Sequence, residues 1–186
     1  MKQQGLFISL EGIDGCGKTT LFHALQEHWA HQNQSLVSLR EPGGTQVSEA
    51  IRQVLLNPDF TNMKPETEAF LYASARAQVC REIIQPALQQ GQIVLADRFT
   101  DSTLAYQGYA RGLKLPFLTQ LNQLCTAGTT PDLTLLLDID PHIAQLRRSQ
   151  QHQAKIVWNR KDSVFRRKYA QVTWNSPKKN PSASRS

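Results

Sequence analysis

Cysteine is scarce in this chain, and long apolar runs are absent. The three cysteines, Cys16, Cys80 and Cys125, lie far apart and form no C-x-x-C pair, which argues against a disulfide framework or a zinc knuckle. No apolar run approaches the roughly 20 residues of a membrane-spanning helix, and Leu6–Leu10 is too short for the core of a signal peptide. We therefore expect a cytoplasmic protein with reduced, structural thiols and no membrane partner.

A basic excess is also absent from most of the chain. The formal net charge is +6, but nine of the 21 basic residues and one of the 15 acidic residues lie from Lys155 onward. The preceding residues are therefore slightly acidic, and we expect them to have no nucleic-acid partner. The sequence predicts a single folded domain over residues 1–154 and an aberrant basic tail over 155–186. Its last part, Ser176–Ser186, has a composition typical of disorder.

Short apolar runs alternate with helical patterns along the domain. Four of these runs are predicted strands: Leu6–Leu10, Leu36–Leu39, Ile93–Ala96 and Leu133–Leu137. A long helical segment is predicted from Glu66 toward Gln90, with an interruption near Pro86 and a stop at Gly91. Another helix is expected after Asp140 and Pro141. The alternation predicts an α/β fold with a parallel sheet covered by helices on both faces.

The segment between the first strand and the first helix matches G-x-x-x-x-G-K-[ST] in full, from Gly12 to Thr19. Backbone N–H groups of such a loop bind phosphates, the lysine reaches the β- and γ-phosphates, and the hydroxyl binds Mg²⁺. We interpret the side chain of Cys16 as filling space, because the loop acts through its backbone. The predicted ATP-binding residues are Gly12, Ile13, Asp14, Gly15, Cys16, Gly17, Lys18, Thr19 and Thr20.

Four further clusters follow in order along the chain. Arg40–Thr45 reads R-E-P-G-G-T after the second strand, a position at which parallel sheets bind ligands. Tyr72 and Arg76 stand four residues apart, on one face of a helix. Asp97–Phe99 follows the third strand, and Ser102–Gly108 reads S-T-L-A-Y-Q-G. Each cluster alone has a plain structural explanation, such as a turn, a core aromatic residue or a surface ion pair.

In this order behind the glycine loop, the clusters resemble the bacterial thymidylate kinases. The resemblance runs from about Phe7 to about Arg148, and R-E-P-G-G-T and D-R-x-x-x-S-x-x-A-Y-Q-G are its most specific strings. It implies a P-loop NTPase fold and an enzyme that phosphorylates dTMP to dTDP with ATP and Mg²⁺, in dTTP synthesis. It also implies a homodimer in the cytoplasm.

The resemblance further implies roles for single residues. The implied catalytic residues are Lys18, Asp14, Arg98, Arg147 and Arg148, of which the last two begin a lid. The implied Mg²⁺ residues are Thr19 and Asp97. Tyr72 is expected to stack on thymine and Arg76 to bond the edge of the base in a bidentate manner, so that Arg76→Ala raises the KM for dTMP more than the KM for ATP. The implied substrate-binding residues are Arg40, Glu41, Tyr72, Arg76, Asp97, Arg98, Thr103, Tyr106 and Gln107.

The resemblance stops after the lid arginines. The family continues with a D-R-x-E-x-E string, a final strand and a final helix, which are absent from the sequence as it stands. Read one base out of frame, however, the codons from Lys155 onward permit that string, and Trp158-Asn159 forces one of its glutamates. We hypothesise a single-base slip near Ala154 or Lys155, which would remove the last strand and helix. The nucleotide sequence there, with an intact mass, tests this hypothesis.

Several other functions stay open at this point. The chain could be a kinase for a different nucleoside monophosphate, a P-loop ATPase or switch protein that transfers nothing, or a catalytically impaired remnant. The basic tail could also be a true arm for nucleic acid or membrane, whose affinity would then depend on salt. Acceptor profiling separates the kinases, and partner-stimulated ATP hydrolysis without a nucleotide acceptor would indicate a switch.

Overall fold

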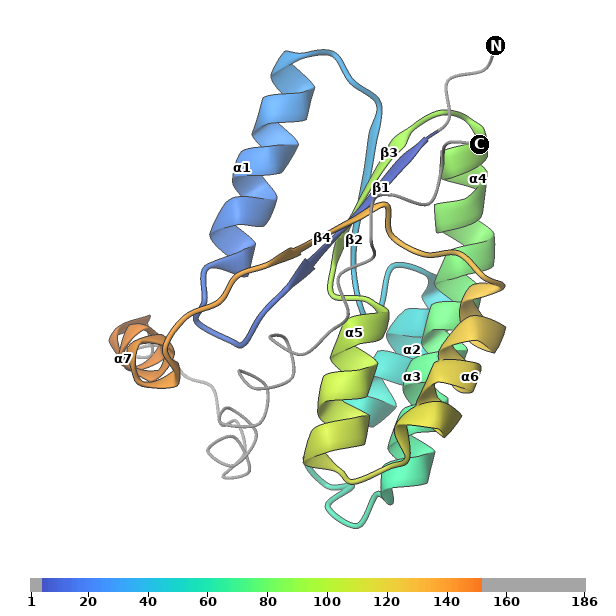
Figure 1. The fold of residues 1–186 in the computed structure, drawn as a ribbon, viewed down its shortest axis with the longest axis vertical. Helices are drawn as coiled ribbons and strands as arrows, with labels where there is room; N and C mark the ends of the chain where they lie inside the picture. The colour runs from blue at the N-terminus through green and yellow to red at the C-terminus, as the bar shows by residue number, and fades with distance from the viewer. Residues whose placement is uncertain (1–4, 152–186) are drawn as a thin grey trace, which may run out of the picture.

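A four-stranded parallel sheet lies at the centre of the structure, a computed structural model that describes residues 5–151. The strands follow the order β2-β3-β1-β4 across the sheet (Figure 1) and comprise β1 Leu6–Glu11, β2 Leu36–Arg40, β3 Ile93–Asp97 and β4 Leu133–Leu136. The α/β class and the parallel sheet predicted from the sequence are confirmed. The predicted basic tail lies outside the described residues. The expected loss of the last strand and helix concerns the same part of the chain.

Helices cover both faces of the sheet because successive strand residues point to opposite sides. Phe7 and Val94 pack toward α3 (Pro65–Val79) and the segments that follow it, whereas Ile8 and Leu95 pack toward α1 (Lys18–His31). Figure 1 shows α1 on one side of the sheet, the helices within residues 46–126 (α2 to α6) on the other, and α7 (Pro141–Gln151) beyond the end of β4. A strand covered on both faces is mostly apolar, as the buried strands β1 and β3 are, whereas β4 is largely exposed.

The long predicted helix is interrupted where the sequence places a proline. The α-helix α3 ends at Val79, a π-helical turn η1 spans Cys80–Ile84, and α4 spans Gln85–Gln89. Pro86 in α4 has no N–H, and its ring displaces the carbonyl group four residues earlier, which wide turns accommodate. Gly91, with φ of 76°, ends the segment.

The remaining helices surround the carboxyl ends of the strands. They are α2 Gln46–Leu56, α5 Thr100–Thr103 with its π-helical continuation η2 Leu104–Ala110, α6 Leu115–Thr126, and α7 Pro141–Gln151. Helix α2 is absent from the sequence prediction, although Thr45 caps its start by accepting a hydrogen bond from the Ser48 N–H at 3.1 Å. None of the helices within residues 5–151 is long and apolar enough to span a bilayer.

The strands end where the charged side chains begin. Leu10 of β1 and Arg40 of β2 both pair with Asp97 of β3, and Glu11 is the last residue of β1. Three of the four strands run one residue further than predicted and so include Glu11, Arg40 and Asp97. The register therefore brings these polar groups to one edge of the sheet, where parallel α/β folds bind ligands.

Candidate functional site

The loop between β1 and α1 has a backbone that side chains would obstruct. Gly12, Gly15 and Gly17 have φ values of 143°, 86° and 101°, which L residues rarely adopt. A Cβ at Gly12 would also lie 2.8 Å from the carbonyl oxygen of Leu137. Helix α1 begins at Lys18, directly after the loop, so its unpaired N–H groups and its positive dipole end are available to an anion. The loop is thus suited to phosphate.

Lys18, Asp14 and Arg98 form a charged cluster beside this loop. Lys18 Nζ donates to the Gly12 carbonyl oxygen at 3.1 Å and lies 4.0 Å from Asp14 Oδ1. Arg98 Nη2 donates to the same Asp14 oxygen at 2.7 Å, and its guanidinium lies 5.2 Å from the centroid of the Tyr106 ring. Arg98 has a φ of 75°, an unusual backbone conformation for a side-chain-bearing residue and one that concentrates at functional sites.

The pKa values of this cluster follow from burial and charge. Burial acts to raise the pKa of Asp14, but the cations Arg98, Lys18 and Arg148 outweigh it, so the pKa is lowered. Burial, and after it the charge of Arg98, lowers the pKa of Lys18, against the opposing charge of Asp97. An ionised Asp14 therefore lies among several cations, and the cluster favours a further anionic group.

Asp97 provides a carboxylate at the end of β3. Its Oδ1 is buried and has no hydrogen-bond partner among the described residues, and Asp97 and Thr19 line the same cavity. No group of three or more His, Cys, Asp or Glu side chains within residues 5–151 could hold a metal ion. Mg²⁺, however, is commonly held by one or two carboxylates together with substrate phosphates and water. The residues present therefore fit Mg²⁺ bound together with a nucleotide.

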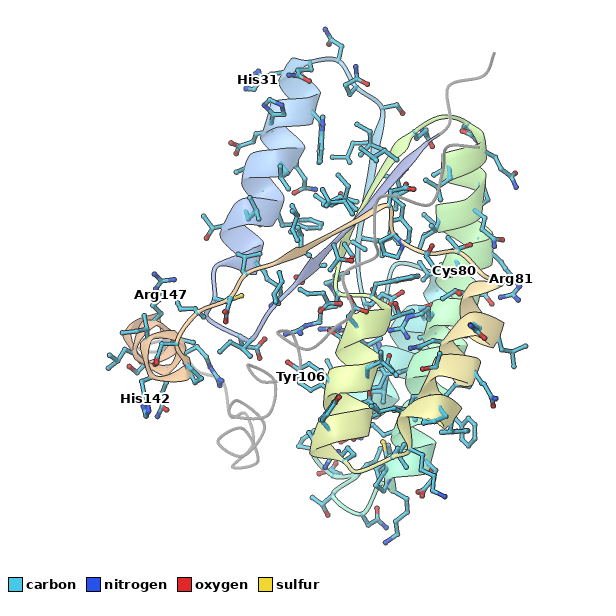
Figure 2. The ribbon with its side chains drawn as sticks, viewed as in Figure 1. His31, Cys80, Arg81, Tyr106, His142 and Arg147 are labelled. Atoms are coloured by element: carbon cyan, nitrogen blue, oxygen red, sulfur yellow. The ribbon has the colours of Figure 1, made fainter. Side chains whose placement is uncertain are left out.

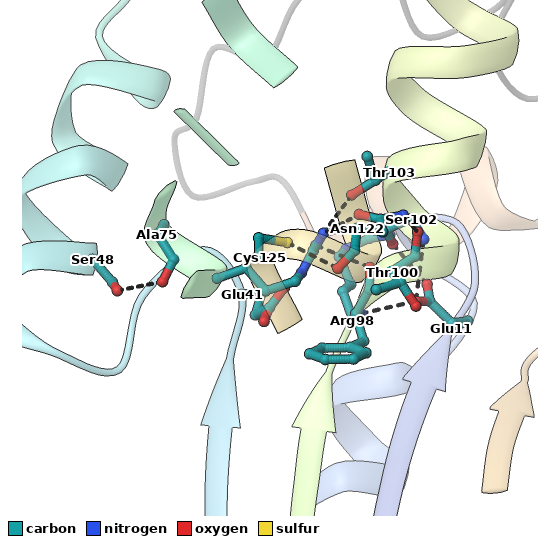
Figure 3. A network of polar contacts seen from close by, with 12 residues as sticks. Glu11, Glu41, Ser48, Ala75, Arg98, Thr100, Ser102, Thr103, Asn122 and Cys125 are labelled. Carbon is teal, nitrogen blue, oxygen red and sulfur yellow. Dashed lines mark hydrogen bonds and ion pairs between the residues drawn. The ribbon is translucent and has the colours of Figure 1, made fainter. Parts of the chain in front are cut away.

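Glu11, which the sequence prediction missed, anchors the segment that carries Arg98. The side chain is only 2% exposed. Its Oε1 accepts hydrogen bonds from the Phe99 and Ser102 N–H groups at 2.9 and 3.3 Å, and its Oε2 accepts one from Ser102 Oγ at 2.7 Å (Figure 3). Glu11 thereby caps the start of α5 from a neighbouring strand.

Replacing Glu11 by glutamine should change how stability depends on pH. Burial is the largest influence on Glu11 and raises its pKa above 4.5, against Arg98 and the Ser102 hydrogen bond. A raised pKa in the folded state means that the folded protein binds the proton more tightly than the unfolded chain, so this group lowers stability as pH rises. The amide that replaces this carboxyl in Glu11→Gln does not titrate, so the variant lacks this loss of stability.

Urea denaturation of the wild type and Glu11→Gln across pH measures this effect. We expect the free energy of unfolding of the variant, relative to wild type, to rise as pH increases above about 4.5 and then to level off. A relative stability that falls over the same range would contradict the raised pKa. Glu66→Gln, a change at an exposed residue of α3, is the control for a changed formal charge.

Arg76 lies in a buried polar network rather than on an open face of α3. Its guanidinium makes four hydrogen bonds: Nε to Glu41 Oε2 at 2.7 Å, Nη1 to Thr103 Oγ1 at 2.7 Å and to Asn122 Oδ1 at 2.9 Å, and Nη2 to the Phe99 carbonyl oxygen at 3.1 Å. Figure 3 shows this network between the ends of the strands and α5. A guanidinium has five N–H donors, and the Cys125 thiol also lies within hydrogen-bonding reach of Arg76. A contact from Arg76 to a ligand, above all a bidentate one, would therefore require some of these internal bonds to break.

A single cavity of about 870 Å³ joins these groups. It is lined at one end by Lys18 and Thr19 of the loop and at the other by Tyr72, Thr103 and Gln107. Burial raises the pKa of Tyr72 and of Tyr106, so both phenols stay neutral at physiological pH. Arg147 of α7 and Tyr106 of η2, both labelled in Figure 2, also belong to the lining. The cavity is therefore cationic at the loop end and aromatic and polar at the other end.

The structure brings most of the predicted site residues together, and a few lie elsewhere. Arg40 does not line the cavity: its guanidinium is half exposed and pairs with Glu49 Oε2 at 3.3 Å. Of the loop residues, Ile13 and Cys16 point into an apolar cluster with Ala105 and Ala144, which agrees with Cys16 as a filling side chain. The predicted residues that line the cavity are Asp14, Gly15, Gly17, Lys18, Thr19, Thr20, Glu41, Tyr72, Arg76, Asp97, Arg98, Thr103, Tyr106, Gln107, Arg147 and Arg148.

Four lining residues are not among the predicted site residues: Pro42 and Ser102, which lie within two of the predicted clusters, and Arg52 and Leu56 of α2. Arg52 of α2 adds a further guanidinium to the wall and donates to the Pro42 carbonyl oxygen at 2.8 Å. Burial, then the charge of Arg40, lowers the pKa of Arg52, against the opposing charge of Glu49. The start signals of α2, Thr45 and Glu49, would have placed Arg52 on a helix that begins directly after Arg40–Thr45, and so close to the predicted site.

Comparison with known proteins agrees with the geometry. The family model described as "Thymidylate kinase" matches residues 10–178. The chain belongs to the thymidylate kinase family. The match extends past Arg148, where the resemblance in the motifs ends, into residues 155–178. Family membership also settles the fold as that of the P-loop NTPases.

Curated thymidylate kinases from several bacteria are about half identical to this chain. The protein from Syntrophotalea carbinolica is 51% identical over 148 residues, which are 80% of this chain and 68% of the relative. That from Bacillus licheniformis is 50% identical over 137 residues (74% and 65%), and that from Desulforudis audaxviator is 54% identical over 136 residues (73% and 62%). The matched part thus spans about two thirds of the length of these relatives.

Proposed function

We propose that this chain transfers the γ-phosphoryl group of ATP to the phosphate of dTMP, giving ADP and dTDP for dTTP synthesis. The observation that carries this proposal is the single cavity, with the phosphate-binding loop at one end, an aromatic and polar wall at the other and Arg98 among its lining residues. Transfer between two anions depends chiefly on holding them end to end and neutralising their charge. A cavity with these two ends serves that purpose.

The donor end is suited to the triphosphate of ATP. The loop amides and the start of α1 would bind the β- and γ-phosphates, and Lys18 would stabilise charge that moves during transfer. Thr19 and Asp97 would hold Mg²⁺, which supplies charge neutralisation on the phosphate oxygens when it is bound. Arg147 and Arg148 of α7 line the cavity and would approach the phosphates from the lid side.

The acceptor end is suited to a nucleoside monophosphate. Tyr72 offers a ring on which a base can stack, and Arg76, which lines the same cavity, can donate to a carbonyl group of that base once the base displaces one of its internal partners. Arg52 and Arg98 place two guanidiniums on the wall, where they would bind the acceptor phosphate. A P-loop switch or ATPase needs no such second pocket, and this observation weighs against that alternative.

A transfer assay with the purified 186-residue protein tests this proposal. Mixed with ATP, Mg²⁺ and dTMP, it should release ADP and dTDP in equal amounts. Replacing dTMP by dCMP should reduce turnover at least tenfold, because a mispaired buried edge costs about 1–3 kcal/mol, and thymidine, which lacks the acceptor phosphate, should give no dTDP. ATP hydrolysis without dTDP would favour a switch or ATPase. Binding of both nucleotides without transfer would indicate a catalytically impaired remnant.

The homodimer and the cytoplasmic location stay predictions. The homodimer rests on the family resemblance, and the cytoplasmic location rests on it and on the scarce cysteines and short apolar runs of the sequence. Sedimentation equilibrium of the same purified protein tests the first, with a mass of twice 21.0 kDa as the expected value.

A further inference from the structure

Gln107 on η2 has the orientation of its amide set by a neighbouring ion pair. The Gln107 Nε2 donates to Glu68 Oε1 at 2.8 Å. Arg111 donates to both oxygens of the same carboxylate, from Nε to Oε1 at 3.2 Å and from Nη2 to Oε2 at 2.5 Å. The carboxylate of Glu68 on α3 is largely buried, with 14% of its side chain exposed. Glu68 and Arg111 do not line the cavity, whereas Gln107 does.

The chemistry of the carboxylate decides which way the amide faces. An ionised carboxylate can only accept hydrogen bonds, and an amide side chain has one donor end and one acceptor end. With the NH₂ group turned to Glu68, the carbonyl oxygen Oε1 is the acceptor that Gln107 has left. No donor within residues 5–151 bonds it, and it is not among the fully buried unpaired atoms, which are Glu41 Oε1 and Asp97 Oδ1. The oxygen is therefore accessible from the cavity that Gln107 lines.

We propose that Glu68, held in place by Arg111, is a positioning residue that keeps the carbonyl oxygen of Gln107 facing the cavity and thereby selects bases with a ring N–H at their edge. This inference rests on the proposed function and gives a physical reason for the preference of the acceptor site for one base. The two residues reach the base only through Gln107. They differ in this from Tyr72 and Arg76, which line the cavity themselves.

The orientation matters because pyrimidines differ in polarity at one ring position. Thymine and uracil carry an N–H at N3, which donates to a carbonyl oxygen, whereas cytosine has an unprotonated N3, which would face that oxygen lone pair to lone pair. A reversed amide would present its NH₂ group instead and would favour cytosine. Fixing the amide thus excludes cytosine by a repulsive contact and not only by a lost bond.

Glu68→Ala tests the proposal by releasing the amide. We expect the dTMP KM and the dissociation constant to rise about tenfold, since a buried hydrogen bond with a preset geometry is lost. The kcat at saturating dTMP should stay within about twofold, because no group at the phosphates changes. Binding of dCMP should become tighter. The ratio of dTMP affinity to dCMP affinity should therefore fall by more than the dTMP affinity itself falls. Glu66→Ala removes an exposed acidic residue from the same first turn of α3 and should change none of these values.

A double-variant cycle separates positioning from a general effect on the fold. If Glu68 acts through Gln107, then Glu68→Ala in a Gln107→Ala background should leave dTMP binding within about twofold of Gln107→Ala alone. A tenfold further loss there, or an unchanged preference for dTMP over dCMP in Glu68→Ala, would overturn the inference.

Calorimetric titration of both nucleotides supplies the preference without any turnover. A wild type that binds dTMP more tightly than dCMP but makes no dTDP therefore refutes the proposed function while the positioning of Gln107 is still measured. A wild type with equal affinity for the two nucleotides overturns the positioning role even if phosphoryl transfer occurs.

Discussion

Replacing Arg76 by alanine should lower the free energy of unfolding by about 3–5 kcal/mol, because breaking a buried ion pair from one side leaves a desolvated charge behind. Arg76 is 3% exposed and Glu41 is 8% exposed. Glu41 Oε2 bonds Arg76, and its Oε1 has no partner among the described residues. The variant also leaves Thr103, Asn122 and the Phe99 carbonyl group without their donor.

Thermal and urea denaturation measure this effect. A loss of about 3–5 kcal/mol corresponds to a Tm lower by about 6–20 °C for a chain of this size. Arg81→Ala is a matched control, because Arg81 is an exposed arginine of the adjoining turn and donates to the Cys125 carbonyl oxygen at 3.0 Å. The free energy of unfolding of Arg81→Ala should fall by less than about 1.5 kcal/mol. Equal losses in the two variants would contradict the special role of the buried pair.

The loss in Arg76→Ala should depend on pH in a defined direction. Burial is the largest influence on Glu41 and raises its pKa above 4.5, while the charge of Arg76 acts to lower it. Without Arg76 the pKa of Glu41 rises further, so the folded variant holds its proton over a wider range of pH and loses more stability as pH increases. The deficit relative to wild type should therefore grow above about pH 4.5. The double variant Arg76→Ala/Glu41→Gln, which retains neither charge of this pair, should recover part of it.

This stability effect bears on the KM test that the sequence suggests for Arg76. A change in the dTMP KM of Arg76→Ala would combine a lost contact to the base with a loosened wall, because Thr103 lines the cavity and is bonded to Arg76. The KM for ATP reports on the loop end and serves as the internal reference. A rise in KM for dTMP without a rise in KM for ATP indicates a change at the acceptor end of the cavity. The measurement must be made on the folded fraction of the variant.

Local signals in the sequence were sufficient for the phosphate-binding loop. The glycines, the apolar run before them and Lys18 after them lie within one short segment, and the structure has a strand, a loop and a helix there. The break before Pro86 was predictable for the same reason, since proline removes a donor within its own helix. The missing α2 was an error of interpretation, because Thr45 at its start and Glu49 in its first turn are ordinary start signals.

Contacts between distant segments were beyond the reach of the sequence alone. Glu11 bonds groups that lie 88 and 91 positions away, and Arg76 bonds Glu41 across 35 positions. A sequence pattern shows that Arg76 lies on a helix near Tyr72, but only the packing of α3 against the strand ends shows that most of its donors are used within the protein. The resemblance placed the residues, whereas the structure assigns their hydrogen bonds.

Lys18→Ala should lower kcat about 10³-fold, the size of effect seen when one preorganised charge at the reacting group is removed. Lys18 is 7% exposed, lines the cavity and is held by the Gly12 carbonyl oxygen at 3.1 Å. Burial and the charge of Arg98 lower its pKa from 10.5, because both disfavour the ammonium form, and the negative charge of bound phosphates would favour it. The Lys18 charge is therefore most favourable in the state with the greatest negative charge, which is the state during transfer.

Initial rates of ADP and dTDP release at saturating ATP and dTMP measure this effect. The fold should persist in Lys18→Ala, because the side chain makes one hydrogen bond to protein, and an unchanged urea midpoint would verify it. Lys114→Ala, at an exposed lysine ahead of α6, is the matched control and should keep wild-type rates. A Lys18→Ala protein that retains a tenth or more of wild-type kcat would show that the loop amides and Arg98 carry the transfer without this ammonium group. The placement of the γ-phosphate beside Lys18 would then be wrong.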